Sequence, residues 1–279
     1  AHMFSSTPGP IGIFDSGYGG LTIFDKIRQR MPGYDYLYLG DNARAPYGVR
    51  SFEVVYQFTR QAVLHLFQAG CQLVILACNT ASAKALRTIQ QRDLPQWDPD
   101  RRVLGVIRPT VECVDRISQS KHIGIVGTAG TIASRSYEIE IAKLFPHIRV
   151  TGEACPMWVP LVEYNEFDGP GADYFVRKNL DHLLQADPAI DTLILGCTHY
   201  PLLMRKIRTF LPAHITPFAQ GEQVAASLED YLRRHPEMDR KLTRGGSCHF
   251  LTTEQTAKFS EAASLFLRSS CPSVEHIEL

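Results

Sequence analysis

Two cysteines stand at matching points of the sequence, each directly after a short apolar run. Cys78 follows Leu-Val-Ile-Leu-Ala, and Cys197 follows Thr-Leu-Ile-Leu-Gly. Residues that form hydrogen bonds come next in both places: Asn79, Thr80, Thr198 and His199. One cysteine at a strand end is most often inert packing, because free cysteine is among the most buried residue types. Two of them with polar neighbours at matching positions instead indicate a pair of thiols that carry protons.

A thiol works as a base near neutral pH only when its pKa, ordinarily about 8.5, is lowered or when a neighbour takes its proton. Both cysteines precede predicted helices, whose N-terminal N–H groups and dipole stabilise a thiolate or a bound carboxylate. His199, two residues after Cys197, can accept or give a proton on that side. Asp15, at the end of the first apolar run, is its counterpart on the side of Cys78. The four groups indicate general acid/base chemistry.

Other kinds of site fit the sequence less well. The segment Asp-Ser-Gly-Tyr-Gly-Gly that begins at Asp15 is not a dinucleotide loop, because the third glycine would fall on Thr22, and no G-x-x-x-x-G-K-[ST] loop occurs. Cys197 and His199 are zinc-ligand types but lack a second pair of ligands. A redox pair of Cys78 and Cys197 stays open as an alternative, unless a substrate lies between the two sulfur atoms.

The segment 40–48, Gly-Asp-Asn-Ala-Arg-Ala-Pro-Tyr-Gly, is rich in turn formers and donors. It is either an ordinary surface turn or a rim that presents backbone N–H groups and the Tyr47 hydroxyl to an anionic substrate. The residues alone leave both readings open.

Short runs of Ile, Leu and Val alternate with longer segments of helical period, which is the pattern of strand-helix units around a parallel sheet. Strands are expected at 11–14, 36–39, 73–77, 103–107, 123–126, 149–152, 192–196, 215–218 and 248–251. Helices are expected at 21–30, 52–69, 81–91, 134–145, 174–185, 202–210, 223–234 and 254–267. The fold class is therefore α/β.

An internal repeat divides the chain into two similar units. The run Ile-Gly-Ile-Phe that ends in Asp-Ser-Gly resembles a later run, Ile-Gly-Ile-Val, that ends in Gly-Thr-Ala, and the two cysteine runs repeat at a similar offset. We therefore expect two pseudosymmetric doubly wound domains with parallel sheets. The first, 10–106 with 216–279, carries Asp15 and Cys78, and the second, 107–215, carries Cys197 and His199. Ligands bind outside the carboxyl ends of such strands, so the active site is expected in the cleft between the domains.

Composition limits the partners and the location. The chain has 279 residues, of which 44% are apolar and 21% charged, as in a folded globular protein. Its 29 basic residues equal its 29 acidic ones, so no net field favours nucleic acid or an anionic membrane. No apolar run reaches the roughly 20 residues that span a bilayer, and a cytoplasmic location is expected. Seven cysteines without C-x-x-C spacing are expected to be reduced and to hold no metal.

Four motifs follow one another over about residues 11–235. They are Ile-Phe-Asp-Ser-Gly-x-Gly-Gly from Ile13, Gly-Asp with Pro-Tyr-Gly from Gly40, Ala-Cys-Asn-Thr-Ala from Ala77, and Leu-Gly-Cys-Thr-His-Tyr-Pro from Leu195. Together they resemble the glutamate racemases of the aspartate/glutamate racemase family. The resemblance implies an enzyme that interconverts L-glutamate and D-glutamate and supplies D-glutamate for peptidoglycan. It also implies that no cofactor, such as pyridoxal phosphate, is needed.

The resemblance also assigns roles by matching position. Cys78 and Cys197 are then the two acid/base thiols, one on each face of the substrate Cα, with Asp15, His199 and Glu163 as their assistants. The implied substrate contacts are Asp15, Ser16, Pro46, Tyr47, Gly48, Asn79, Thr80, Thr128, Thr131, Thr198 and His199. The family likeness allows a homodimer.

Two other functions stay open beside this one. They are an aspartate racemase with the same pair of thiols, and a binding protein that closes on an acidic amino acid without inverting it. Two stretches depart from the pattern of the family: Arg108, where many relatives have a smaller or acidic residue, and Ala219-Gln220-Gly221, where they have an Asp-Ser-like stretch. Neither departure falls within the catalytic motifs.

Overall fold

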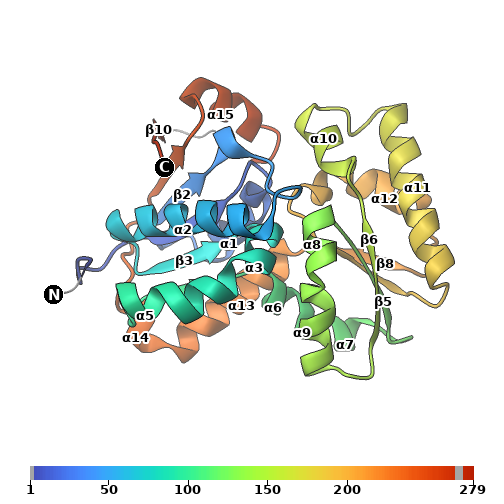
Figure 1. Ribbon diagram of the computed structural model, residues 1–279, viewed down its shortest axis with the longest axis horizontal. Helices are drawn as coiled ribbons and strands as arrows, with labels where there is room; N and C mark the ends of the chain where they lie inside the picture. Colours follow the sequence, from blue (N-terminus) through green and yellow to red (C-terminus); the bar gives the residue numbers. More distant parts are fainter. Residues whose placement is uncertain (1–2, 268–272) are drawn as a thin grey trace.

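Two parallel sheets flanked by helices form the frame of the computed structural model, which describes residues 3–267 and 273–279 (Figure 1). The strands are β1 Ile11–Asp15, β2 Tyr36–Gly40, β3 Leu73–Leu76, β4 Arg102–Leu104, β5 His122–Gly127, β6 Arg149–Ala154, β7 Thr192–Leu195, β8 Thr216–Phe218, β9 Cys248–Thr252 and β10 Val274–His276. One sheet has the order β10-β9-β2-β1-β3-β4 and the other β6-β5-β7-β8. We call the half built on the six-stranded sheet the first lobe and the other half the second lobe. The predicted α/β class with parallel sheets is confirmed.

The central strands of the two lobes repeat one topology. The order β2-β1-β3-β4 in the first lobe matches β6-β5-β7-β8 in the second, and β9 and β10 extend the first sheet beyond β2. In both lobes the strand order reverses at one point, between β1 and β3 and between β5 and β7. A ligand crevice forms at such a point, outside the carboxyl ends of the strands. The cysteines that follow β3 and β7 therefore lie where ligands bind in folds of this type.

The strands differ from their predicted ranges mainly at the ends. The strand expected at 103–107 ends at Leu104, because Ile107 already begins a helix. β10 escaped prediction, since it has three residues, of which Glu275 and His276 are exposed. β8 pairs with β7, so the second sheet includes residues 216–218, which the predicted division assigns to the first domain. The domain boundaries otherwise remain a prediction.

The helices fill the connections between strands. The longer ones are α1 Gly20–Arg30, α2 Phe52–Gln68, α9 Ser136–Leu144, α11 Pro170–Ala186, α13 Gly221–Arg234 and α15 Thr256–Ala263. The shorter ones are α3 Asn79–Lys84, α4 Leu86–Thr88, α5 Leu94–Trp97, α6 Ile107–Val111, α7 Val114–Ile117, α8 Ala129–Ser134, α10 Trp158–Glu163, α12 Met204–Phe210 and α14 Pro236–Asp239. The helix expected at 81–91 is interrupted at Ala85, whose φ is −120°. The helix expected at 134–145 begins later, because Arg135 is left-handed with a φ of 56° and separates α8 from α9.

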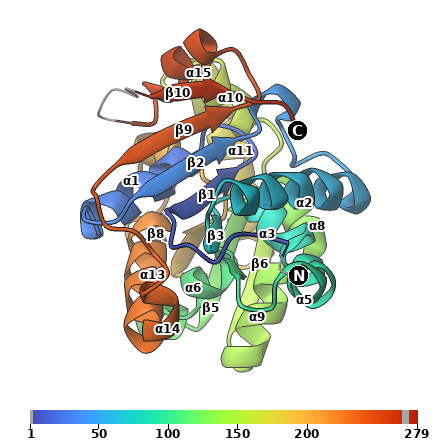
Figure 2. The same cartoon turned by 90° about the vertical axis from the view of Figure 1, so that its left-hand side faces the viewer.

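Helices cover both faces of each sheet. Figure 2 shows α2 and α5 on one side of the first sheet and α1 with α13 on the other. In Figure 1, α8 and α9 stand on the side of the second sheet next to the first lobe, and α11 lies beyond the sheet. Every residue of β1, β3 and β7 is buried, as expected for parallel strands covered on both faces. Within residues 3–267 and 273–279, no helix is long and apolar enough to cross a membrane.

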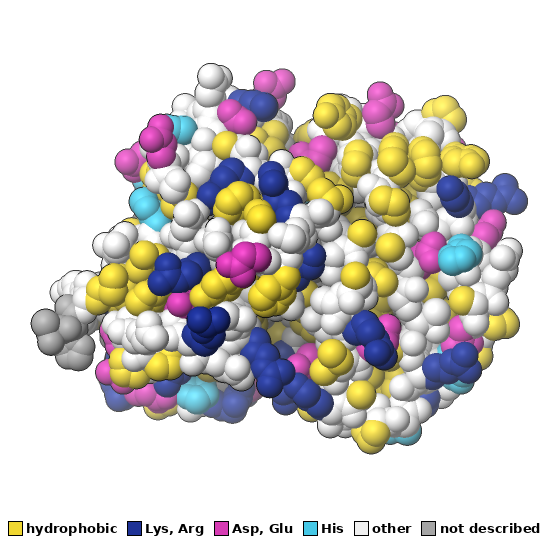
Figure 3. Space-filling view, in the orientation of Figure 1, with side chains coloured by type: hydrophobic (Ala, Val, Ile, Leu, Met, Phe, Trp, Pro, Cys, Tyr) yellow, Lys and Arg dark blue, Asp and Glu magenta, His cyan; other side chains and the backbone are white. Residues whose placement is uncertain are grey.

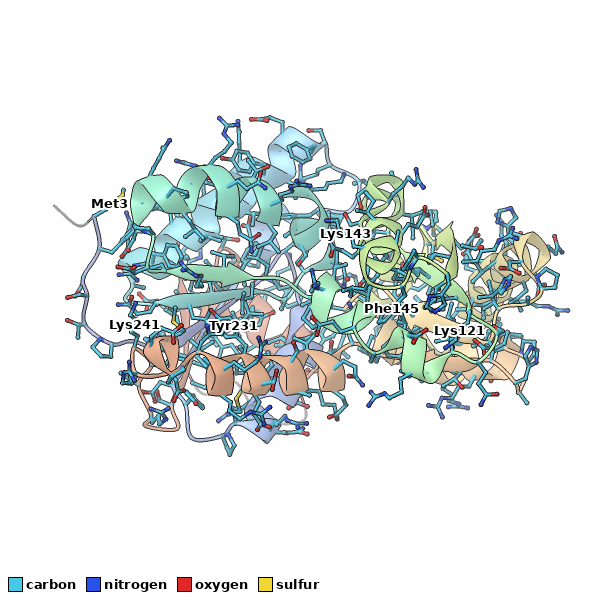
Figure 4. The ribbon with its side chains drawn as sticks, turned by 90° about the horizontal axis from the view of Figure 1, so that it is seen from below. Met3, Lys121, Lys143, Phe145, Tyr231 and Lys241 are labelled. Carbon is cyan, nitrogen blue, oxygen red and sulfur yellow. The ribbon has the colours of Figure 1, made fainter. Side chains whose placement is uncertain are left out.

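The lobes meet along short helices. α3 of the first lobe packs against α8 of the second, and α13 returns from β8 to pack against α1. Seen from below in Figure 4, α13 runs along the first lobe, with Tyr231 and Lys241 on the side away from Lys121, Lys143 and Phe145 of the second lobe. On the face drawn in Figure 3, atoms of both lobes meet along the junction, and Lys and Arg side chains gather at its lower part.

Candidate active site

Cys78 lies at the carboxyl end of β3 and begins α3. The backbone N–H of Ala77 still donates to Phe14 of β1 at 2.7 Å, so the strand is held up to the residue before the thiol. The Cys78 Sγ caps the helix, accepting from the Ala81 N–H at 3.3 Å, and lies 3.4 Å from the Ser16 Oγ. Only 4% of Cys78 is exposed. The thiol is therefore fixed between the ends of β1 and β3.

The surroundings of Cys78 favour the protonated thiol. Burial raises the pKa of Cys78 to about 12, and the nearby charge of Asp15 acts in the same direction. Contacts with Ser16 and with the Ala81 N–H act against this rise without cancelling it. At neutral pH Cys78 is therefore a protonated thiol, which can act as an acid.

Asp15 ends β1 and joins it to α1. Its Oδ2 accepts from the Gly20 N–H at 2.7 Å at the start of that helix. Burial raises the pKa of Asp15, while the Gly20 N–H and the positive charge of His199 lower it in part. The carboxyl therefore links the Cys78 side of the site electrostatically to His199 of the second lobe.

Cys197 occupies the corresponding place after β7. The Gly196 N–H donates to Val126 of β5 at 2.8 Å, and the Cys197 Sγ lies 3.9 Å from the His199 Nδ1. The His199 Nε2 forms a hydrogen bond to the carboxylate of Glu163, which ends α10. Cys197 is 7% exposed. The second lobe thus presents a row of sulfur, imidazole and carboxylate.

His199 is cationic in this row at neutral pH. Burial alone lowers its pKa, but the contacts with Cys197 and with the Glu163 carboxylate outweigh burial and raise the pKa of His199 to about 10. A protonated imidazole beside a thiol can supply or recover the proton that the thiol exchanges.

The two thiol sides come together across the lobe junction. A Cβ placed on Gly19 of the first lobe would lie 2.3 Å from the Thr198 Oγ1 and 2.4 Å from the His199 Nδ1 of the second. The Thr22 hydroxyl donates to the Thr198 carbonyl at 3.0 Å. Cys197 is also close enough to Cys78 for its charge to raise the pKa of Cys78 further. The structure therefore brings the Cys78 side and the Cys197 side together at one junction.

Hydroxyl groups from both lobes meet beside the thiols. The Thr80 Oγ1 lies 3.2 Å from the Thr128 Oγ1 and 3.4 Å from the Thr131 Oγ1. The carbonyl of Gly48 accepts from the Gly130 N–H at 2.9 Å, which joins the 40–48 loop to the start of α8. These groups form a polar contact between the lobes next to Cys78.

The 40–48 loop lies over the ends of the first-lobe strands. Its Ala45–Pro46 peptide bond is cis, and the next residue, Tyr47, is buried. The Tyr47 hydroxyl donates to the carboxylate of Asp41, which also accepts from the Arg44 guanidinium at 2.7 Å. The loop is thus a fixed part of the junction rather than an open surface turn.

The structure brings some of the predicted site residues into contact at this junction: Cys78 with Ser16, Thr80 with Thr128 and Thr131, and His199 with Cys197 and Glu163. Pro46 is instead exposed, and Tyr47 bonds to Asp41 rather than to another predicted residue. Four residues at the junction were not predicted: Gly19, Asp41, and the Tyr137 and Gln220 side chains that donate to the Asn79 Oδ1. A second glycine in the Asp-Ser-Gly-Tyr-Gly-Gly segment was the available signal for Gly19, because a close backbone approach requires the absence of a Cβ. No group of three or more metal-ligating side chains occurs in the part of the chain that the structure describes.

Comparisons with known proteins agree with this fold. The model of the Asp/Glu/Hydantoin racemase family matches residues 18–228. A glutamate racemase of Roseobacter denitrificans is 43% identical over 269 residues, which cover 92% of this chain and 96% of that protein. The solved glutamate racemase isoform RacE1 of Bacillus anthracis aligns with a TM-score of 0.87 at 34% identity, over 97% of this chain and 98% of that one. The glutamate racemase of Francisella tularensis, solved with D-glutamate, aligns with a TM-score of 0.86 at 30% identity over the same shares.

The chain therefore belongs to the Asp/Glu/Hydantoin racemase family. Within that family, the relatives and solved structures just described are glutamate racemases. The resemblance drawn from the four sequence motifs is thereby confirmed.

Proposed function

We propose that this chain interconverts L-glutamate and D-glutamate, with Cys78 and Cys197 as the two bases. The amino-acid racemase activity expected from the sequence agrees with the family and with relatives named glutamate racemase. The observation that carries the assignment of the bases is their placement. Two strand-end thiols from equivalent positions in two lobes lie at one junction, with the Asp15 carboxyl near Cys78 and the His199 imidazole beside Cys197.

The reaction needs one proton to leave the Cα and another to arrive on the opposite face. From one enantiomer, the thiolate of one cysteine takes the Cα proton and becomes a thiol. The thiol of the other cysteine then protonates the carbanion from the opposite face and becomes a thiolate. The two cysteines have exchanged protonation states, so the same groups serve the reverse reaction with their roles exchanged. Two bases on opposite faces invert the centre without turning the substrate over.

Charge that develops on the α-carboxylate as the proton leaves has to be stabilised. α3 begins directly after Cys78, and α8 begins directly after Thr128. The hydroxyls of Thr80, Thr128 and Thr131 lie close together where these two helices begin. Preorganised donors of this kind contribute about 3 kcal/mol each to transition-state stabilisation. Ser16, Tyr47, Gly48, Asn79 and Thr198 complete the proposed set of substrate contacts, with Asp15 and His199.

Substrate entry requires the lobes to separate. Cys78 and Cys197 are 4% and 7% exposed, and Gly19 leaves no room for a Cβ, which would lie 2.3 Å from the Thr198 Oγ1. The Thr80–Thr128 contact and the Gly48–Gly130 hydrogen bond join the lobes on the same side. We propose that these contacts loosen to admit glutamate and form again around it, which excludes water from the carbanion.

We place the enzyme in the cytoplasm, where it supplies D-glutamate for peptidoglycan, as the family resemblance implies. The same resemblance allows a homodimer, and light scattering on the purified chain at micromolar concentration distinguishes a dimer from a monomer.

Racemisation in heavy water tests the function. L-glutamate incubated with the purified chain in D2O without added cofactor should yield D-glutamate and deuterium at Cα. Glutamate that stays wholly L and unlabelled contradicts the proposal. Parallel incubation with L-aspartate separates a glutamate racemase from an aspartate racemase. Tight binding of glutamate without exchange would instead identify a binding protein.

A further inference from the structure

Gln220 is a buried residue to which the proposed reaction assigns no role. It lies between β8 and α13, where the chain returns from the second lobe to the first, and only 3% of it is exposed. Its backbone position is tightly held, because a Cβ on the next residue, Gly221, would lie 2.7 Å from the Lys26 Cγ of α1. A buried amide at the crossover between two lobes has to find partners there.

The amides of Gln220 and Asn79 form a reciprocal pair. The Asn79 Nδ2 donates to the Gln220 Oε1 at 2.7 Å, and the Gln220 Nε2 donates to the Asn79 Oδ1 at 3.0 Å. The two residues are 141 positions apart in the sequence. Asn79 directly follows Cys78, so this pair attaches the thiol-bearing end of β3 to the crossover.

Two hydroxyls extend the pair into a buried network. The Gln220 Nε2 lies 2.9 Å from the Thr110 Oγ1 and 2.6 Å from the Tyr137 hydroxyl, and the Tyr137 hydroxyl donates to the Asn79 Oδ1. The two Nε2 hydrogens are thus shared among three acceptors. Thr110 belongs to α6, on the other connection between the lobes, so one amide joins both connections.

The network also reaches the second thiol. Tyr137 lies on α9 of the second lobe, and a Cβ on Gly196 would lie 3.4 Å from its Cε2. Gly196 directly precedes Cys197. Burial raises the pKa of the Tyr137 hydroxyl, and the charge of Cys197 acts in the same direction, which places the phenol within electrostatic reach of that sulfur. One end of the network therefore adjoins Cys78 and the other adjoins Cys197.

We propose that Gln220 is a positioning residue that sets the spacing of the two thiols on either side of the substrate. This role rests on the proposed two-thiol function. Within that function, the hydrogen-bonded network around Gln220 holds the two bases at a fixed separation. The Gln220 amide also fixes the orientation of the Asn79 amide, because the Asn79 Nδ2 donates to the Gln220 Oε1 and the Asn79 Oδ1 accepts from the Gln220 Nε2. Proton transfer depends steeply on distance, so loss of this spacing slows the chemical step more than it weakens binding.

The test replaces Gln220 and measures the chemical step directly. Gln220→Leu should lower kcat by at least about tenfold with a smaller change in KM. It should also raise the primary isotope effect seen with glutamate deuterated at Cα, because proton transfer becomes more fully rate-limiting. Gln220→Glu keeps the volume but cannot donate to Asn79, Thr110 or Tyr137, so it should also lose activity. Retained activity in Gln220→Glu would show that donation from the Gln220 Nε2 is not needed and would overturn the proposal.

Gln72 offers a matched control. It is another amide that is 3% exposed, and its Nε2 donates to the backbone of Ser5 at 3.2 Å and Thr7 at 3.0 Å, away from the lobe junction. Gln72→Leu should lower the unfolding temperature while leaving kcat and the isotope effect unchanged. Equal kcat and equal isotope effects in Gln220→Leu, Gln72→Leu and the parent would refute the positioning role.

A second readout does not depend on racemase activity. In the free protein the Asn79 side-chain amide should exchange its hydrogens with solvent slowly, and Gln220→Leu or Gln220→Glu should make that exchange at least about tenfold faster. An Asn79 amide that already exchanges freely in the parent overturns the inference. If the amide is protected but the parent does not racemise glutamate, the proposed function fails while the network itself stands.

Discussion

The two thiols occupy equivalent places in two repeated sheets, yet their surroundings differ. Cys78 is enclosed by the first lobe beside a buried carboxyl, Asp15, and burial raises its pKa to about 12. Cys197 faces a cationic imidazole, His199, which is itself held by the carboxylate of Glu163. A repeated fold therefore supplies matched positions for the two thiols, while their neighbours differ: a buried carboxyl near Cys78 and a cationic imidazole beside Cys197.

The overall equilibrium limits what this asymmetry can do. Two enantiomers have equal free energies in water, so the ratio of kcat/KM in the two directions is 1 whatever surrounds the thiols. Different neighbours can therefore alter kcat and KM separately in each direction, or change which protonation state the free enzyme favours. They cannot favour one product. Variants on the two sides should be compared in both directions for this reason.

Removal of either thiol should have the largest effect. Cys78→Ser and Cys197→Ser each leave a hydroxyl that is far less acidic than a thiol, so racemisation should fall by about 10²–10⁴-fold. Binding of glutamate, measured by calorimetry, should persist because the donors around the substrate remain. Cys71→Ala is the matched control, since Cys71 is fully buried in the first lobe and packs beside Gly12. Unchanged turnover in either serine variant contradicts the two-thiol assignment.

A methyl group on Gly19 should have the next largest effect on kcat/KM, because it pushes the two lobes apart beside the thiols. The new Cβ would lie 2.3 Å from the Thr198 Oγ1 and 2.4 Å from the His199 Nδ1. Gly19→Ala should therefore displace the second lobe and lower kcat/KM by about 10²-fold. Gly33→Ala is the control, since a Cβ at Gly33 meets nothing within 4 Å. Equal kcat/KM in the two alanine variants would show that the lobes do not need this close approach.

His199→Gln tests the charge of the imidazole beside Cys197 through the pH dependence of the unfolding free energy. The pKa of His199 is raised from 6.5 to about 10 in the folded chain, so protonated His199 stabilises the fold. This contribution is fully present below about pH 6.5 and is lost as the pH rises through about 10. The parent should therefore exceed His199→Gln in unfolding free energy at pH 6 by more than at pH 10, as measured by urea denaturation. A gap that stays constant or widens with pH would mean that His199 is neutral in the folded protein.

The sequence predicted the frame of the site well, because the signals are local. Continuous apolar runs define β1, β3, β5 and β7, and the polar residues after them mark the carboxyl ends where ligands bind. The repeat then shows that two such ends correspond. Helix breaks were harder to foresee, since nothing in the composition around Ala85 or Arg135 forces the departure from helical geometry seen there.

Contacts between distant segments were beyond the reach of the sequence. The Asn79–Gln220 pair spans 141 positions, and the stretch around Gln220 looked only like a departure from the family pattern. The role of Gly19 likewise depends on how closely the second lobe approaches. Arg108, the other departure, lies half-exposed on the surface and pairs with Glu112 at 3.5 Å and Glu140 at 3.6 Å. Exposed pairs of this kind contribute little, so no role in the site follows for it.

Ser16→Ala should have the smallest effect on kcat/KM, and it changes a contact of Cys78 alone among the two thiols. The Ser16 Oγ lies 3.4 Å from the Cys78 Sγ and acts against the rise in the pKa of that thiol. Its loss should make the Cys78 thiolate harder to form and lower kcat/KM by about threefold to tenfold, the value of one modest hydrogen bond. The alkaline limb of the pH-rate profile should move to higher pH if Cys78 ionisation controls it. Because the equilibrium constant is 1, kcat/KM must fall equally in both directions, while kcat need not. A fall confined to kcat for one enantiomer would show in which direction Cys78 takes the proton. An unchanged alkaline limb would mean that loss of the Cys78 proton in the free enzyme does not limit the rate.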